Sequence, residues 1–229
     1  MLGGHMESQI QQRISRMYDT YADQYESAEG HGILTSTEKE AWSADIRAAA
    51  DLQVDHKVLE VGAGTGVFSR LLAEWGCPVV GLDSSEAMLT EAHKRLPPSM
   101  ARQIDFRLGD THQQNLFEPQ TFDWIVSRYL VNHLHDPWLV FQNWKHWLRA
   151  NGSVLVIEGL WPRSDWGDDD LVDTLPLSCL QTRATVAYLL EKAGLTIQAN
   201  VWLERVNTYF AAQGNSVSRF YMIVARRTT

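Results

Sequence analysis

The stretch VLEVGAGTG, residues Val58 to Gly66, and the stretch VVGLDSS, residues Val79 to Ser85, decide the fold of this 229-residue chain. In each, a short β-branched run typical of a buried strand leads into a segment with helical periodicity. Gly62, Gly64 and Gly66 stand where a strand must turn sharply and let the backbone approach a ligand. The two stretches therefore predict strand–turn–helix units with a ligand at the turn.

Apolar runs and helical segments alternate outward from this stretch. The predicted strands are Val58–Val61, Val79–Leu82, Ile104–Leu108, Trp124–Val126, Val154–Ile157, Leu195–Leu203 and Ser218–Ala225. The predicted helices are Val67–Trp75, Ser85–Arg95, Pro137–Arg149, with a C-cap at Asn151-Gly152, and Thr182–Ala193. The first five runs are continuously apolar, as in a parallel sheet covered on both faces. We therefore expect an α/β fold with a doubly wound, mostly parallel, Rossmann-like sheet.

The domain organisation is predicted as a helical cap followed by one α/β domain. Residues 1–5 read as a tag remnant, with a native start at Met6. Residues 6–50 predict an N-terminal helical lid built from helices at Gln9–Glu26 and Thr35–Leu52. Residues 51–229 are expected to form the Rossmann-like domain, with a poorly periodic lid insertion at about 159–178.

Composition narrows the classes of partner. The net charge is −8 and the basic residues are scattered, which disfavours nucleic acids and anionic membranes. The sequence shows neither an apolar run of the ~18 residues that span a bilayer nor a signal peptide. Its two cysteines, Cys77 and Cys179, have no metal-ligand spacing, so no metal is predicted. We expect a cytoplasmic enzyme with a small-molecule substrate, and the sequence leaves the oligomeric state open.

Acidic residues follow three successive predicted strands. Glu60 suits a ligand ammonium group, Asp83 a ribose diol, and Asp110 an adenine amino group. Val67 stands where a dinucleotide fingerprint requires its third glycine, and no P-loop lysine is present. This pattern indicates a nucleoside ligand with an amine and no phosphate, and S-adenosylmethionine (SAM) is such a ligand.

Over about Tyr18 to Ile157 the chain resembles the class I SAM-dependent methyltransferases, particularly the small-molecule branch related to ubiquinone-type methyltransferases. The resemblance implies that the methionine moiety is lined by Glu60, Gly62, Ala63 and Gly64. It implies ribose recognition by Asp83 and adenine contacts from Ser84, Met88, Asp110 and Thr111. The segment Ser127-Arg128-Tyr129 resembles the family stretch whose backbone carbonyl meets the SAM amino group, which makes Ser127 a cofactor-binding candidate.

Candidates for the acceptor side come from tyrosines and a histidine. Tyr18, Tyr21 and Tyr25 recur at i, i+3 and i+7, which predicts one face of a helix. Either they pack that helix down, or their hydroxyls reach the sulfonium or the nucleophile. Histidine acts near neutral pH, which makes His133 and His135 general-base candidates. The resemblance favours His133, which stands where many relatives present a pocket histidine. A packing role stays open for both, and His31 is a candidate gate.

The insertion carries Asp165, Asp168, Asp169 and Asp170 between Trp161 and Trp166. These acids either attract a cationic substrate or form a solvated lid. The tryptophans either wall the pocket or anchor the loop. A core role is predicted for Trp138, Phe141, Trp144 and Leu148.

Three functions remain compatible with the sequence. The first is a SAM-dependent methyltransferase that acts on N, O or C of a small metabolite. The second is cyclisation of SAM by its own amine, which releases methylthioadenosine and an azetidine amino acid. The third is a non-catalytic SAM-binding protein, which would bind SAM without turnover.

Overall fold

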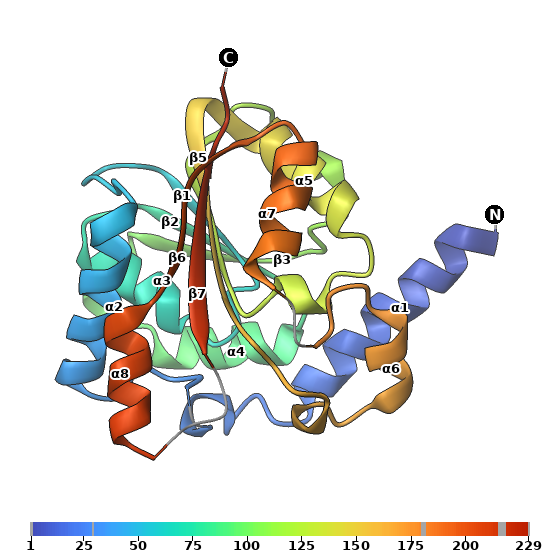
Figure 1. Ribbon diagram of the computed structural model, residues 1–229, viewed down its shortest axis with the longest axis horizontal. Coiled ribbons are helices and arrows are strands. Elements are labelled where there is room, and N and C mark those ends of the chain that lie inside the picture. The colour runs from blue at the N-terminus through green and yellow to red at the C-terminus, as the bar shows by residue number, and fades with distance from the viewer. Residues whose placement is uncertain (1, 29, 180–181, 215–218, 229) are drawn as a thin grey trace.

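The computed structural model describes residues 2–28, 30–179, 182–214 and 219–228. Within them lies a seven-stranded sheet with strand order β3-β2-β1-β4-β5-β7-β6 (Figure 1). The strands are β1 (Val58–Val61), β2 (Val79–Asp83), β3 (Ile104–Leu108), β4 (Phe122–Arg128), β5 (Leu148–Gly159), β6 (Thr196–Trp202) and β7 (Phe220–Arg226). Strands β1 to β5 are parallel, and β7 is antiparallel to its neighbours β5 and β6. The predicted doubly wound, mostly parallel sheet is confirmed.

Helices bury both faces of the sheet. One face carries α2 (Ser36–Ala49), α3 (Val67–Glu74), α4 (Glu86–Arg95) and α8 (Glu204–Ala212). The other carries α5 (Pro137–Trp147) and α7 (Arg183–Lys192). Fully buried Trp42 of α2 and Trp144 of α5 belong to the two separate cores. Removal of this apolar surface from water is the main force that holds the layers together.

The helices α1 (Leu2–Asp19) and α6 (Asp169–Thr174) lie side by side, and α1 also contacts α4 (Figure 1). Ile14 of α1 packs against Leu171 and Leu175 in a small apolar cluster. Arg13 forms a bidentate ion pair with Asp168, at 2.5 Å for both contacts. Among the described residues of the predicted 6–50 lid, α1 and the turn after it line a pocket at the carboxyl ends of the strands. The helix α2 packs on the sheet instead.

Short 3-10 turns complete the chain: η1 (Tyr25–Ser27), η2 (Pro98–Met100), η3 (Gln114–Leu116), η4 (Val131–His133) and η5 (Arg163–Asp165). Among the described residues, no helix has the length and apolar character needed to cross a bilayer. Met1 of the predicted tag remnant and Ser218, the predicted start of the last strand, lie outside the described residues.

The first predicted helix is wrong in its extent. It ends at Asp19 rather than Glu26, and the chain continues in tight turns in which Tyr21 N bonds Tyr18 O and Gln24 N bonds Tyr21 O. These i→i+3 bonds replace helical ones. Tyr21 and Tyr25 are therefore not on one helical face with Tyr18, although the three rings still gather within 5.6 to 6.4 Å of each other.

The end of α5 also differs from its prediction. The helix stops at Trp147, and Asn151, with φ of 62°, lies inside β5 near a register shift against β4. Asn151 does adopt the predicted left-handed conformation, but within an irregular strand. The core prediction fails for Trp138, which is 45% exposed, and holds for Trp144.

The sequence analysis missed α8, whose N-terminus is capped from far away in the chain. The Asp45 carboxylate of α2 accepts hydrogen bonds from the backbone N–H groups of Arg205 (2.9 Å) and Val206 (3.1 Å). No local N-cap side chain bonds this helix. A cap supplied by tertiary packing leaves no start signal in the local sequence.

Candidate active site

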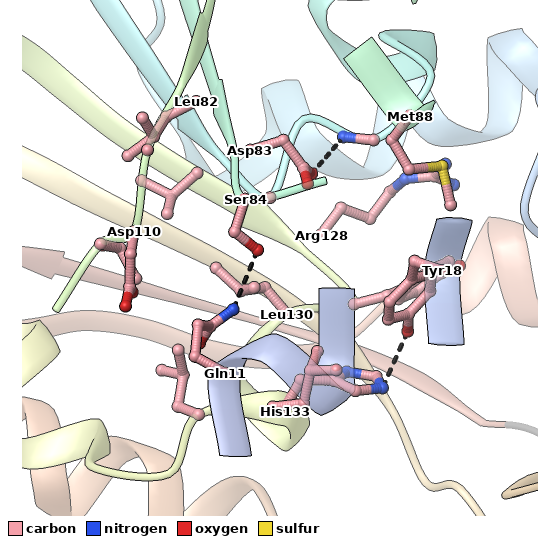
Figure 2. Close-up of a pocket in the computed structure, with 18 of the residues that line it drawn as sticks. Gln11, Tyr18, Leu82, Asp83, Ser84, Met88, Asp110, Arg128, Leu130 and His133 are labelled. Carbon is pink, nitrogen blue, oxygen red and sulfur yellow. Dashed lines mark hydrogen bonds between the residues drawn. The ribbon is translucent and has the colours of Figure 1, made fainter. Parts of the chain in front are cut away.

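A pocket lies where the carboxyl ends of β1 to β4 meet α1 (Figure 2). Of the residues predicted from the sequence, it brings together Tyr18, Tyr25, Gly62, Gly64, Asp83, Ser84, Met88, Asp110, Thr111 and His133. It is also lined by Gln11 and Ile14 of α1, by Arg128 at the end of β4, and by Tyr129 and Leu130 just after it. Its free space is about 70 Å³, well below the ~300 Å³ at the low end of ligand pockets, so α1 closes it tightly.

Asp83 organises the glycine loop. Its carboxylate accepts the backbone N–H of Gly64 and that of Ser85, both at 2.8 Å. Gly62 and Gly64 have φ of 73° and 54°, a conformation that glycine adopts without strain. Burial raises the pKa of Asp83, while the backbone N–H groups oppose that rise. A carboxylate has about four lone-pair sites, so Asp83 retains capacity to accept ligand hydroxyls.

Side chains of α1 contact the loop that follows Asp83. Gln11 donates its side-chain amide to Ser84 Oγ at 2.9 Å, as Figure 2 shows, and Ser15 Oγ lies 3.1 Å from the same oxygen. Ser85 Oγ donates to Asp19 at 2.6 Å. The lid helix is thus hydrogen-bonded to the floor of the pocket.

Asp110 lies after β3 and remains a carboxylate. It accepts the backbone N–H of His112 at 3.0 Å and contacts His112 Nδ1 at 2.6 Å. Burial alone would raise the pKa of Asp110, but the hydrogen bonds and charge of His112 outweigh it and lower the pKa. Beside it, Thr111 Oγ1 accepts Trp144 Nε1 at 2.9 Å, which fixes this loop to α5.

Tyr18 and His133 form a hydrogen-bonded pair within the pocket. The Tyr18 oxygen lies 2.8 Å from Nε2 of His133 (Figure 2). Nδ1 of His133 lies 2.7 Å from Asn132 Oδ1. Burial lowers the pKa of His133 to about 3 and raises that of Tyr18. For a neutral imidazole these contacts assign the proton to Nδ1, so the Tyr18 hydroxyl donates to Nε2. The Trp166 ring lies 4.7 Å from His133.

Arg128 is a pocket residue that the sequence analysis quoted without giving it a role. It is 8% exposed, and its guanidinium donates to the backbone oxygens of Gly30, at 3.3 Å, and His31. It lies over the ring of Tyr129 at 4.7 Å. Within the part of the chain that the structure describes, no carboxylate lies within 4.0 Å of this guanidinium. The sequence signal that could have identified Arg128 is an arginine at the end of a buried strand, at the edge of the sheet where the ligand is expected.

Tyr129 adopts a left-handed backbone conformation at the end of β4, with φ of 61°. Such a conformation is strained for a bulky residue and is often found at functional sites. The Tyr129 ring is buried and contacts Trp161 at 5.1 Å between ring centres. This bend ends the strand immediately after Arg128.

Four predicted site residues do not line the pocket. Glu60 points away because strand residues alternate between faces and its neighbour Val61 lines the pocket. The Glu60 carboxyl accepts the Ser69 hydroxyl of α3, and burial raises its pKa to about 8. It therefore does not present a carboxylate to a ligand ammonium group.

The other three do not place their side chains in the pocket. The Ala63 methyl group lies against Gly81 of β2, and the Ser127 side chain is fully buried inside β4 with its hydroxyl unbonded. The predicted contact of Ser127 is through its backbone carbonyl and stays a prediction. Tyr21 is half-buried beside Tyr18 but outside the pocket.

Glu158 is a second residue that the sequence analysis missed. It is fully buried at the carboxyl end of β5 and accepts the N–H of Val131 at 2.8 Å and Trp161 Nε1 at 3.2 Å. Burial raises its pKa to about 7. Through Val131 it holds the η4 turn that carries His133.

His31, the candidate gate, and the acidic residues of the predicted lid insertion contact side chains of the protein itself. His31 stacks on Tyr25 at 4.6 Å, and burial, together with the Arg128 charge, lowers its pKa to about 4. Asp168 caps α6 and pairs with Arg13. Asp169 and Asp173 pair with Arg163, and the side chain of Asp165 lies outside the described residues. The described acids of this loop are therefore occupied by arginines, which favours the lid interpretation over attraction of a cationic substrate.

Comparison with known proteins gives a family match and distant relatives. Residues 59–156 match the family described as "Methyltransferase domain". Phosphoethanolamine N-methyltransferase 1 of Triticum aestivum is 31% identical over 133 residues, covering 58% of this chain and 26% of that protein. Demethylmenaquinone methyltransferase of Bacillus cereus is 23% identical over 156 residues, covering 67% of this chain and 65% of that protein. The chain thus matches about a quarter and about two thirds of these relatives' lengths.

The fold itself recurs in solved structures. The [4+2]-cyclase SpnF superposes with a TM-score of 0.70 at 15% identity, covering 96% of this chain and 97% of that one. At this identity the likeness concerns the fold alone, and the fold does not dictate the reaction.

Proposed function

We propose that this chain, whose residues 59–156 match a methyltransferase domain, is a class I SAM-dependent methyltransferase that transfers a methyl group from SAM to the amine nitrogen of a small molecule. The observation that carries the proposal is the Tyr18–His133 pair, which lines the same pocket as Asp83 and the glycine loop. A neutral phenol–imidazole pair that can accept a hydrogen bond from the acceptor, and a nucleoside-type cradle in the same pocket, are the two components that support such a transfer.

The cofactor half of the pocket fits SAM in three places. Asp83 supplies acceptors for the ribose hydroxyls, and Asp110 supplies one for the adenine amino group. Arg128 is a buried cation that lines the pocket, and its guanidinium donates to the neutral backbone carbonyls of Gly30 and His31. A buried charge is costly without a counter-ion, so Arg128 suits the SAM carboxylate.

Methyl transfer is an in-line displacement in which the N–C bond forms as the C–S bond breaks. The acceptor nitrogen gives its electron pair to the methyl carbon, the sulfonium takes up the C–S pair, and S-adenosylhomocysteine leaves. The nitrogen must also release one proton. The Tyr18 oxygen accepts a hydrogen bond from the acceptor N–H while its own proton is directed at Nε2 of His133. Closure by α1 aligns the reactants and excludes water.

The surroundings of the pair favour an amine over other acceptors. The rings of Tyr25 and Trp166 lie close to Tyr18 and His133, respectively, and aromatic faces attract ammonium groups. The relative from Triticum aestivum is by name an N-methyltransferase, which supports the same class.

The direct test incubates the protein with SAM and a panel of small primary and secondary amines, with phenols and β-dicarbonyl compounds as comparison sets. S-adenosylhomocysteine is measured by mass spectrometry. We expect turnover with at least one amine and loss of that turnover in Tyr18→Phe. Turnover confined to phenols or carbon acceptors would contradict the nitrogen assignment.

Cyclisation of SAM by its own amine is the second candidate, favoured by the small free space of about 70 Å³. In that reaction the substrate is SAM alone, and the products are methylthioadenosine and an azetidine amino acid. Incubation with SAM alone distinguishes cyclisation from methyl transfer. Formation of methylthioadenosine above the spontaneous rate would favour cyclisation and contradict methyl transfer. SAM binding without any product would instead indicate a non-catalytic binder.

A further inference from the structure

Three potential metal ligands gather beside the cofactor pocket. One ligand atom from each of Asp110, His112 and His135 lies within 4.8 Å of the other two. The imidazole rings of His112 and His135 are nearly parallel, at 9°, with centres 3.7 Å apart. Asp110 and His112 come from the loop after β3 and His135 from the segment between η4 and α5, so chain spacing gave no sign of this cluster.

The backbone that carries these side chains is anchored to α5. The buried Asn143 amide donates to the backbone oxygens of Thr111 and His112, both at 3.0 Å. Asp136, next to His135, caps the same helix through the N–H of Leu139 at 2.9 Å. Both ligand-bearing segments are therefore fixed to one rigid element. Binding of an ion then requires only side-chain rotation, in which the stacked rings turn until their in-plane nitrogen lone pairs converge and the His112 Nδ1–Asp110 contact opens.

We propose that Asp110, His112 and His135 bind a first-row divalent transition metal, with zinc as the ion that fits best. Two imidazole nitrogens and one carboxylate oxygen form a donor set that zinc, cobalt and nickel prefer. Magnesium prefers oxygen ligands alone. Three protein ligands leave a fourth position for water, the arrangement of an open zinc site.

The cluster has its own route to solvent. Asp110, His112 and His135 line a surface groove together with Gln12, Arg16 and Leu139. An ion therefore reaches the ligands without passing through the closed pocket. The Tyr18–His133 pair does not line this groove. The metal thus fixes the loop that carries Asp110 and does not act on the reacting atoms.

The test is a zinc titration of the chelator-treated full chain by isothermal calorimetry. It needs neither SAM nor an acceptor, so its outcome is independent of the proposed function. We expect one zinc ion per chain with a dissociation constant in the micromolar range or below. His112→Ala and His135→Ala should each weaken binding at least tenfold, and cobalt should give visible absorption bands with the wild type.

The matched control is His146→Ala, the same substitution in the last turn of α5, which should leave zinc affinity unchanged. Unfolding midpoints measured without metal show whether each variant is folded, and His135→Asn replaces His135→Ala if that variant is unstable. Absence of zinc binding in the wild type overturns the proposal. Equal zinc affinity in the wild type and the His112→Ala/His135→Ala double variant also overturns it.

Discussion

The phenol oxygen of Tyr18 lies 2.8 Å from Nε2 of His133, so the lid helix α1 meets the turn after β4 at a single hydrogen bond across 115 residues of chain. Asn132 Oδ1 contacts Nδ1, the other nitrogen of the His133 ring. The Glu158 carboxyl accepts the N–H of Val131 and so fixes the η4 turn that carries His133. Because closure of α1 brings the phenol to the imidazole, the pair is complete only when the pocket is closed.

Tyr18→Phe and His133→Asn should each lower kcat by about 10²-fold, the usual contribution of a positioned proton acceptor. SAM affinity should stay nearly unchanged in His133→Asn. Because the two residues act as a unit, the double variant should lose little more than the worse single variant. The readout is S-adenosylhomocysteine formation with SAM affinity measured separately, and Tyr188→Phe on the exposed face of α7 is the control. Wild-type kcat in His133→Asn would return His133 to a packing role.

Asp83→Ala should weaken SAM binding by roughly 2 to 3 kcal/mol, on the order of 30- to 150-fold, because a charged acceptor is lost. Methylthioadenosine carries the same ribose, so its binding should weaken in parallel. The unfolding midpoint should be followed as well, since Gly64 and Ser85 lose their acceptor. Asp105→Ala on the exposed side of β3 is the matched control. Unchanged affinity for both ligands would remove Asp83 from the ribose site.

Arg128→Met should discriminate between the same two ligands. S-adenosylhomocysteine, which has a carboxylate, should bind at least tenfold more weakly, whereas methylthioadenosine, which has none, should bind as in the wild type. Arg107→Met, at an exposed arginine of β3, is the control. An equal loss for both ligands would mean that Arg128 only holds the Gly30–His31 turn.

The stability of the free protein should decrease with pH because of Glu158. Its folded pKa of about 7 lies above its ordinary value of 4.5. Between these values the unfolded chain has released a proton that the folded protein retains, so the stabilising contribution is complete below pH 4.5 and is lost as pH rises through 7. The expected slope is roughly −1.4 kcal/mol per pH unit within that window.

Glu158→Gln imitates the protonated carboxyl and should make this decline shallower in unfolding midpoints recorded from pH 5 to 8, with a residual slope from Glu60, whose pKa burial raises to about 8. Exposed Glu118→Gln should retain the wild-type slope. Parallel curves for the wild type and Glu158→Gln would show that Glu158 ionises as easily in the folded protein as in the unfolded chain.

Local sequence patterns predicted the strands and the ligand-side turns of the sheet, because hydrophobic periodicity and turn residues act over a few neighbouring positions. β-branched runs marked β1 and β2, and the glycines with Asp83 marked the turn at their carboxyl ends. The acid pattern marked Asp110 and the family resemblance favoured His133, and both line the pocket. Asp83 and Asp110 lie at or just after strand ends, so parallel pairing brings them to one edge of the sheet.

What the sequence could not supply is side-chain direction and long-range pairing. Glu60 was assigned to the ligand because it ends a strand, but strand alternation turns it toward Ser69. Arg128 and Glu158 gain their character only from burial in the assembled fold. Tyr18 and His133 were each identified as candidates, but their contact depends on where α1 docks.

The hydrogen bonds from Gln11 and Ser15 to Ser84 have a kinetic consequence. They place α1 over the loop that carries Asp83. For the proposed methyl transfer we therefore expect ordered binding, with SAM first and the acceptor second, and with S-adenosylhomocysteine released last. S-adenosylhomocysteine should inhibit competitively against SAM and non-competitively against the acceptor, and solvent viscosity should slow the steady-state rate if release limits turnover.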